Sequence, residues 1–104
     1  CQEYGNACDR GISAALNSTN DIIIAAGMDG WMYILDNASG SLLWEFNTNV
    51  DFSEYSEYTD ISAYGGTIEG LGPVIAGNNL FINSGYQYGG NMPGNVLLNF
   101  ELLD

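Results

Sequence analysis

The sequence has almost no positive charge. Its 104 residues include a single Lys or Arg, which is Arg10, and no His, against 13 Asp and Glu, so the formal net charge is −12. Nucleic acids and anionic membrane surfaces bind to positive protein faces, so they are excluded as partners. The lack of His excludes a Ser-His-Asp triad, a Cys-His pair and a His-ligated zinc or iron site.

Cysteines and long apolar runs are also scarce. Cys1 and Cys8 are too few to build a four-cysteine zinc site or an iron–sulfur cluster alone. The longest strongly apolar run is residues 22–26, which is too short to span a bilayer, so we expect no membrane insertion. Because Cys1 and Cys8 are close in sequence, with Gly5 between them, a local disulfide is favoured over two buried free thiols. A disulfide would place the protein in an oxidising compartment.

The residues that are present predict a folded chain of short strands. Hydrophobic residues make up 46% and aromatic residues 12%, which excludes an acidic disordered tail. The pattern predicts four short strands within residues 12–47, the first of them at 12–16. Turns such as Asp29-Gly30 and Ser39-Gly40 separate the later strands. Such a series is typical of an antiparallel meander.

Part of this pattern then repeats. Residues 14–27 and 73–85 each contain a small-residue strand, a polar turn and a second apolar strand that ends in Gly. A third strand is predicted at 95–102, and the chain ends at Asp104 before a fourth. Repeated four-stranded sheets are typical of β-propellers, which close with several such blades.

We therefore expect an all-β fold of about two antiparallel four-stranded blades of a β-propeller. Within one domain at 1–104, the expected parts are a blade at 12–47, an acidic linker at 48–70 and an incomplete blade at 71–102. The missing fourth strand suggests a C-terminal fragment of a larger propeller. A self-contained β-sandwich of seven strands is the alternative.

A family resemblance is carried by residues 35–46, LDNASGSLLWEF. They resemble the repeat of pyrroloquinoline-quinone (PQQ) propellers, in which Asp36, Gly40 and Trp44 would be the motif residues. The Gly-rich stretches at 70–77 and 90–100 resemble the C-terminal part of polyvinyl-alcohol dehydrogenase-like quinoproteins. In that family the Trp packs between neighbouring blades, so we expect Trp44 to be buried there.

The resemblance implies a periplasmic or secreted enzyme that oxidises alcohols with PQQ and a calcium ion. Its partners would be the remaining propeller blades of the same chain and a cytochrome c electron acceptor. The calcium ligands and catalytic base of the family do not map onto this sequence, so no catalytic or metal-binding residue is assigned. The fragment alone is expected to be inactive and to hold no cofactor. Related propellers without a quinone make a protein- or polysaccharide-binding scaffold the alternative function, and a structural repeat without a ligand a third.

Loop lengths indicate which face would carry a ligand. In a propeller, the linker 48–70, the turn 27–30 and the loop 85–94 share one face, and long loops on one side of a rigid scaffold are typical binding sites. Glu69 is a candidate cofactor-binding residue because it is a lone carboxylate just before the second predicted sheet.

Two further cofactor-binding candidates lie in the insert after residue 85. Tyr86 and Asn91 offer an aromatic face and an amide, which suit a planar quinone or a hydroxylated substrate. A Gly-rich loop that packs on the linker is an equally good interpretation. The acidic series at 51–60 is interpreted as a solvated loop or a single helical turn, and an acidic rim that faces calcium or substrate is the alternative.

Overall fold

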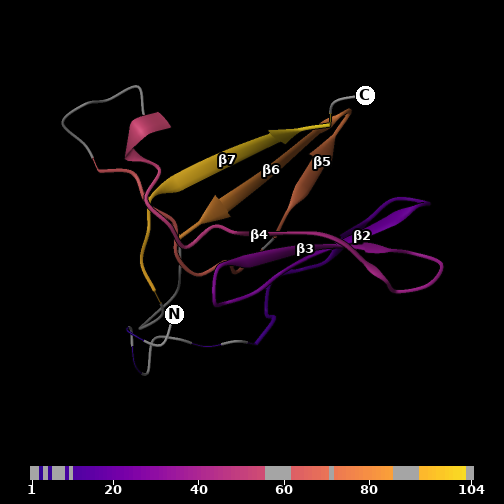
Figure 1. Ribbon diagram of the computed structural model, residues 1–104, viewed down its shortest axis with the longest axis horizontal. Coiled ribbons are helices and arrows are strands. Elements are labelled where there is room, and N and C mark those ends of the chain that lie inside the picture. Colours follow the sequence, from indigo (N-terminus) through magenta and orange to yellow (C-terminus); the bar gives the residue numbers. More distant parts are fainter. Residues whose placement is uncertain are drawn as a thin grey trace.

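The computed structural model describes residues 3, 5, 9, 11–55, 62–70, 72–85 and 92–102. These residues form two antiparallel β-sheets, of four and three strands (Figure 1). The expected all-β fold, with sheets that fit propeller blades, is therefore confirmed. None of the described residues belongs to a helix long and apolar enough to cross a membrane.

The first sheet is a meander of four neighbouring strands. Its order is β1 (Asn17–Ser18), β2 (Ile22–Ala26), β3 (Trp31–Asp36) and β4 (Leu42–Asn47). The turn between β2 and β3 is closed by Asp29, whose Oδ1 accepts a hydrogen bond of 3.1 Å from the N–H of Trp31. Gly30 completes this turn with a φ of 90°, in the left-handed region that favours Gly.

The first strand was predicted at 12–16, and that placement is wrong. β1 is only Asn17–Ser18, while the N–H of Ala15 donates to the carbonyl oxygen of Gly70, 3.0 Å away. The segment before β1 therefore bonds to the chain that leads into the second sheet instead of pairing with β2. A Cβ on Gly72 would lie 2.2 Å from the carbonyl oxygen of Ala15, so the two backbones touch there.

The second sheet has three strands in the order β5 (Val74–Ala76), β6 (Asn79–Ser84) and β7 (Val96–Glu101). The hairpin of β5 and β6 has a two-residue turn closed by Ala76 and Asn79, and the hairpin of β1 and β2 has one closed by Thr19 and Ile22. Aligning the two hairpins at these turns defines which residues of the two sheets correspond, and it shifts the alignment of the sequence repeat by one residue.

In this alignment Ile24 corresponds to Phe81. Through their strand partners, Met32 and Ile34 of β3 then correspond to Leu97 and Asn99 of β7. Among the described residues, no strand of the second sheet corresponds to β4, as the repeat predicted.

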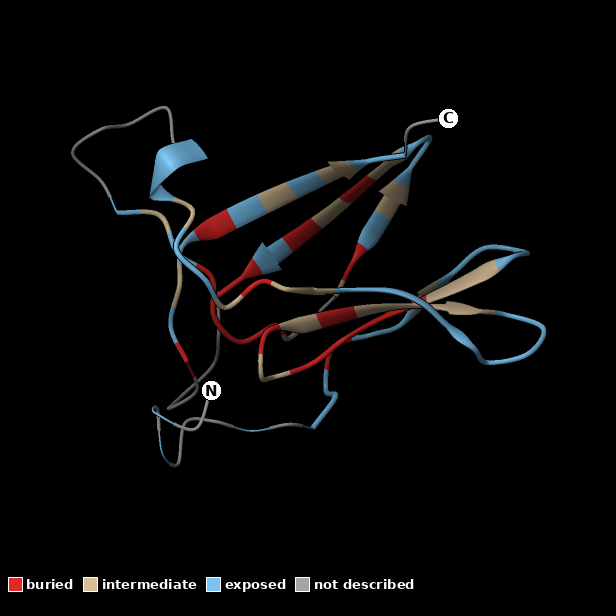
Figure 2. Ribbon diagram, in the orientation of Figure 1, coloured by how far each residue is buried: buried red, intermediate tan, exposed pale blue. Residues whose placement is uncertain are grey.

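The core lies between the two sheets (Figure 2). Alternate residues of β2, β3, β6 and β7 face it, because successive side chains of a strand point to opposite sides. Its most buried members are Ile24, Ala26, Met32, Ile68 and Ile82, each at most 1% exposed. Buried residues concentrate toward the end of the sheets where the loops gather, and most of β4 is exposed.

Trp44 contacts the second sheet but is not buried, which corrects the expectation. Its ring lies 5.5 Å from that of Phe100 in β7, edge to face, and 5.8 Å from that of Phe46. It nevertheless keeps 36% of its surface exposed. The reason is that β4 is an edge strand, and Phe100 is the one aromatic ring among the described residues that contacts Trp44 from the facing sheet.

The acidic stretch after β4 contains one short 3₁₀ turn, η2 (Ser53–Tyr55). This agrees with the interpretation as a single helical turn, although residues 56–61 lie outside the described part. The disulfide expected between Cys1 and Cys8 also lies outside the described residues and stays a prediction.

Candidate functional site

Five loop segments meet at one end of the two sheets. We call them together the loop face: residues 27–30, 48–50, 64–69, 84–85 and 92–95. Hydrogen bonds join these segments to one another across the two sheets. The turn 27–30, the linker and the loop after β6 thus share a face, as expected. The following contacts show what this face can do chemically.

The first contact network centres on two fully buried hydroxyls. Thr48 and Ser84 are both 0% exposed, and their Oγ atoms lie 2.8 Å apart. Thr48 also donates from its hydroxyl and its N–H to the carbonyl oxygen of Gly30. Ser84 accepts from the N–H of Gly66 at 2.8 Å. Because Thr48 follows β4 and Ser84 ends β6, the pair ties the first sheet to the second.

A second network centres on Thr67, which is also 0% exposed. Its hydroxyl donates to the carbonyl oxygen of Met28 at 2.6 Å and accepts from the N–H of Met92 at 3.1 Å. Its main chain bonds Met92 and Gly85. The buried hydroxyls of the loop face are therefore committed to the protein's own main chain, and their role is to hold the loops in place.

Two adjacent glycines allow the loops to approach this closely. A Cβ on Gly65 would lie 1.7 Å from the carbonyl oxygen of Thr48. A Cβ on Gly66 would lie 2.5 Å from the carbonyl oxygen of Met92. Real Cβ atoms never come so near to main-chain oxygen, so both positions require Gly.

Glu69 lies where the loop face leads into the second sheet. Before it, the N–H of Ile68 donates to the carbonyl oxygen of Gly27 at 3.2 Å. After it, Gly70 has a φ of 75° and accepts from Ala15. Glu69 itself is half-buried. The other two candidates for cofactor binding, Tyr86 and Asn91, lie outside the described residues.

The motif residues Asp36 and Gly40 lie at the opposite end of the strands, in the turn between β3 and β4. Oδ2 of Asp36 accepts from the N–H of Ser39 at 3.0 Å and from its hydroxyl at 2.6 Å. These bonds hold the pKa of Asp36 below its ordinary value. Gly40 has a φ of 76° and donates to the carbonyl oxygen of Asp36. This turn shapes the sheet and is far from the loop face.

A small cleft of about 390 Å³ opens on the loop face. Its lining residues are Glu3, Asn49, Val50, Asp51, Ser62, Tyr64 and Gly65. Asp51 accepts from the N–H of Ser53 at 2.8 Å, and hydrogen bonds to Ser53 lower its pKa, so it stays ionised. The cleft therefore carries negative charge.

The charge and the possible ligands of these residues show whether they fit PQQ and calcium. PQQ is a planar quinone that carries carboxylates, and the two carboxylates of the cleft would repel it. No group of three or more acidic, His or Cys side chains that could hold a metal exists in the part of the chain that the structure describes. The described residues therefore do not fit a complete quinone or calcium site by themselves.

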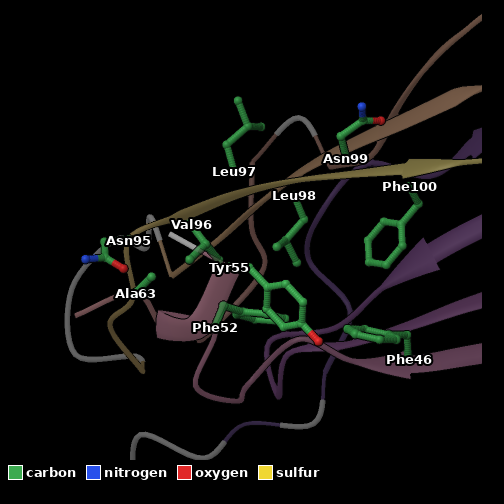
Figure 3. Close-up of a pocket in the computed structure, with 10 residues that line it drawn as sticks. All are labelled: Phe46, Phe52, Tyr55, Ala63, Asn95, Val96, Leu97, Leu98, Asn99 and Phe100. Carbon is green, nitrogen blue, oxygen red and sulfur yellow. The ribbon is translucent and has the colours of Figure 1, made fainter. Parts of the chain in front are cut away.

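A larger groove of about 570 Å³ lies beside β7, and the sequence did not predict it (Figure 3). It is lined by Phe46, Phe52, Tyr55, Ala63 and residues 95–100. Phe46 stacks on Phe52 at 6.4 Å and meets Phe100 edge to face at 5.1 Å. The only signal in the sequence is the apolar alternation of Val96, Leu98 and Phe100, because the other rings come from distant segments.

Comparison with curated proteins gives two matches along almost the whole chain. A polyvinylalcohol dehydrogenase from Pseudomonas sp. is 33% identical over 110 residues, which cover 98% of this chain. A polyvinylalcohol dehydrogenase from Sphingopyxis sp. (strain 113P3) is 29% identical over 104 residues, or 91% of the chain.

The chain is related in sequence to polyvinylalcohol dehydrogenases. The resemblance expected from residues 35–46 and from the Gly-rich stretches is thus confirmed. The matched region is only 17% and 16% of the length of these two relatives. No protein-family model matches the chain. No solved structure matches it significantly either.

Proposed function

We propose that this chain is part of a PQQ-dependent dehydrogenase that oxidises alcohols. The observation that carries the proposal is the 33% identity to a polyvinylalcohol dehydrogenase across 98% of the chain. An all-β structure of two blade-like sheets is the scaffold that the resemblance implies. The two relatives are about six times as long as the matched region, so the rest of the cofactor site would lie in other blades.

Within such an enzyme, the loop face would form part of the wall of the cofactor pocket. Thr48, Thr67 and Ser84 would hold the loops rigid, since their hydroxyls bond the main chain on both sheets. Glu69, Tyr86 and Asn91 would approach the cofactor. PQQ would supply the electron-accepting quinone and calcium would polarise it. The ligands of both, and the catalytic base, would come mostly from the remaining blades.

Glu69→Gln in the complete dehydrogenase tests this assignment. Gln keeps the size of the side chain and removes its charge. If Glu69 contributes to the site, dye reduction with added PQQ and Ca²⁺ should fall about tenfold or more while the unfolding temperature stays the same. The matched control is Glu45→Gln, an exposed carboxylate of β4, which should leave turnover unchanged. Unchanged turnover in Glu69→Gln would remove this residue from the site.

The proposed location of the enzyme is periplasmic or secreted, with a cytochrome c as electron acceptor. A disulfide between Cys1 and Cys8 would fit such an oxidising compartment. Mass spectrometry of the non-reduced protein should find these two cysteines linked. Two free thiols would contradict the disulfide.

A non-catalytic scaffold that binds a protein or a polysaccharide is the second candidate function. The apolar groove beside β7 favours it, together with the poor fit of a quinone to the described loop residues. The complete protein distinguishes the two: PQQ-dependent dye reduction supports the dehydrogenase, and its absence with saturating PQQ and Ca²⁺ supports the scaffold.

A further inference from the structure

The cleft on the loop face has a wall of its own, built by the linker between the two sheets. Residues 50–52 and 63–65 run antiparallel there, with Asp51 and Tyr64 as bridge partners. Two main-chain N–H···O=C bonds join them, with nitrogen–oxygen distances of 2.7 and 3.0 Å. We call these residues the linker ribbon. The linker therefore has paired main chain at the cleft, although it belongs to neither sheet.

The two faces of the linker ribbon have different surroundings. Residues directly opposite each other in an antiparallel pair point to the same side, and their neighbours in the chain point to the other. Phe52 and Ala63 line the apolar groove beside β7, whereas Asp51 and Tyr64 line the cleft. The carboxylate of Asp51 and the ring of Tyr64 therefore face the same cavity.

Hydrogen bonds hold the linker ribbon in one position. The side chain of Asn95 accepts from the N–H of Tyr64 at 3.0 Å and donates to the carbonyl oxygen of Ser62 at 2.8 Å. Oγ of Ser53 accepts from the N–H of Ala63 at 3.1 Å. A site whose wall is fixed before binding loses less conformational entropy when a ligand arrives, so this cleft is prepared for an occupant.

The cleft has an apolar side. Val50 and Tyr64 line it and keep 41% and 40% of their surface exposed. An aromatic ring attracts a cation that lies over its face. Lys and Arg combine an apolar stem with a cationic head, so the stem can pack on Val50 while the head lies against Tyr64.

The polar atoms that line the cleft are mostly hydrogen-bond acceptors. Asp51 is ionised, and Glu3 adds a second carboxylate. Nδ2 of Asn49 donates to Sδ of the buried Met92 at 3.5 Å, so its amide oxygen is the atom that remains for a ligand. No basic side chain among the described residues lines the cleft, since Arg10 lies outside them. A cation that donates hydrogen bonds therefore fits the cleft, and an anion does not.

The negative charge extends beyond the cleft. Glu54 is exposed just after the first half of the linker ribbon, and the sequence places Glu57 and Asp60 in the segment that joins the two halves. This charge favours an occupant with several basic residues over a single free amine. A second copy of the chain is disfavoured, because each copy has a net charge of −12.

We propose that the cleft beside the linker ribbon is a docking site for a basic segment of another protein. One Lys or Arg side chain of that segment enters the cleft and packs against the ring of Tyr64. Its cationic group donates to Asp51, Glu3 and the amide oxygen of Asn49. The proposal concerns a partner protein and does not depend on the proposed dehydrogenase activity.

A labelled peptide of alternating Gly and Lys tests the proposal. Titration into the 104-residue protein, followed by anisotropy, should give saturable binding that weakens as the salt concentration rises. The main-chain amide NMR signals of residues 49–51 and 62–65 should shift along the same binding curve. The same peptide with Glu in place of Lys should not bind. Shifts spread evenly over the whole protein would mean charge attraction without a site and would overturn the proposal.

Asp51→Asn separates the cleft from general charge attraction. It keeps a side-chain oxygen that can accept from Ser53 and removes the charge, so peptide binding should weaken about tenfold. The matched control is Asp21→Asn, in the exposed turn before β2 at the opposite end of the strands, which should change affinity less than about threefold. Equal effects would overturn the proposal. If Asp51→Asn proves unfolded by circular dichroism, Glu3→Gln gives the same comparison.

The ring of Tyr64 is tested by two substitutions. Tyr64→Phe keeps the aromatic face and should bind the peptide within about twofold of the wild type. Tyr64→Leu keeps an apolar side chain without a ring and should bind about threefold more weakly. Wild-type affinity in Tyr64→Leu would contradict the proposed position of the cationic group.

The same assay distinguishes two competing occupants. n-Butylamine that binds as tightly as the peptide would make a free amine the ligand. Peptide binding that is detected only in Arg10→Gln would make Arg10 of the same chain the occupant. Either result would overturn the docking proposal, and so would the absence of peptide binding at millimolar concentration and low salt.

Discussion

One glycine of the loop face, Gly65, is closely surrounded by main chain. Gly65 has no room for a side chain, because a Cβ would overlap the carbonyl oxygen of Thr48. We expect Gly65→Ala to destabilise the protein by about 3 kcal/mol or more, since backbone rather than a flexible side chain must move. Urea denaturation measures this.

Gly70→Ala is the matched control. Gly70 has a φ of 75° but no atom within 4 Å of its Cβ position. This substitution should cost only the strain of the left-handed conformation, about 1 kcal/mol. Equal losses of stability in Gly65→Ala and Gly70→Ala would show that the close main-chain contact with Thr48 does not exclude a side chain at position 65.

Asp36 makes stability depend on pH through the turn between β3 and β4. The side-chain and main-chain hydrogen bonds from Ser39 lower its pKa from the ordinary value of 3.8. A lowered pKa in the folded state means that ionised Asp36 stabilises the fold above 3.8, and that this contribution disappears as pH falls below that value.

The contribution of Asp36 is measured with Asp36→Asn. The wild type should exceed the variant in urea midpoint at neutral pH, and the difference should shrink as the pH is lowered through and below 3.8. Taking the difference removes the common effect of the other carboxylates. A difference that is constant with pH would mean that the charge of Asp36 has no role in the turn.

At the scale of elements, Thr48 and Ser84 connect the end of β4 to the end of β6. Ser84→Ala would leave the buried N–H of Gly66 without its side-chain acceptor, which should cost about 2 kcal/mol. Thr48→Val keeps the shape, and the main-chain bond to Gly30 remains, so it should cost about 1 kcal/mol. Thermal unfolding of both variants checks this order, and the reverse order would contradict it.

The aromatic contact between the sheets is a second link between elements. Trp44→Ala removes ring contacts with Phe46 and Phe100, but a third of the Trp44 surface is already in water. We therefore expect a loss of about 2 kcal/mol, below the 3–5 kcal/mol typical of a fully buried ring. Trp44→Phe should recover part of this stability. A loss as large as for full burial would indicate that another surface covers Trp44 in solution.

The elements that the sequence predicted well are those with local signals. The Asp29-Gly30 turn and the short apolar runs within residues 12–47 and 73–85 depend on residues that are neighbours in the chain, and β2, β3 and β6 lie within these predicted ranges. The apolar residues 12–16 gave an equally local signal, but their main chain bonds Gly70 instead of β2. This hydrogen bond joins segments that are far apart in the sequence. It overrides the local strand pattern, and the local pattern cannot predict it.

The site was predictable only in part for the same reason. The placement of the linker and the turns on one face followed from the strand order. The bonds of Thr48 to Ser84, 36 residues away, and of Thr67 to Met28, 39 residues away, have no signature in a single sequence. The groove beside β7 likewise joins Phe46, Phe52 and Phe100, whose spacing along the chain shows no period.

At the scale of the whole molecule, the cofactor expected from the resemblance needs more surface than these residues provide. The chain matches about a sixth of the length of its two relatives. Its described loop face offers carboxylates, and hydroxyls that already hydrogen-bond to the protein's own main chain. We expect the isolated 104-residue protein to neither bind PQQ nor reduce a dye in the presence of alcohol, PQQ and Ca²⁺.

Equilibrium dialysis with PQQ, followed by its absorbance, measures the binding directly, and the complete dehydrogenase is the positive control.

The reason for the expected difference between the isolated chain and the complete dehydrogenase is electrostatic as well as geometric. A protein with a net charge of −12 repels an anionic quinone unless cations or basic side chains offset that charge, and this chain has one Arg. Raising the Ca²⁺ concentration should therefore not restore PQQ binding to the isolated chain, because the described residues gather no set of ligands for the ion. Stoichiometric PQQ binding by the 104 residues alone would show that the quinone site lies within this chain, and the proposed division of the site among several blades would then be wrong.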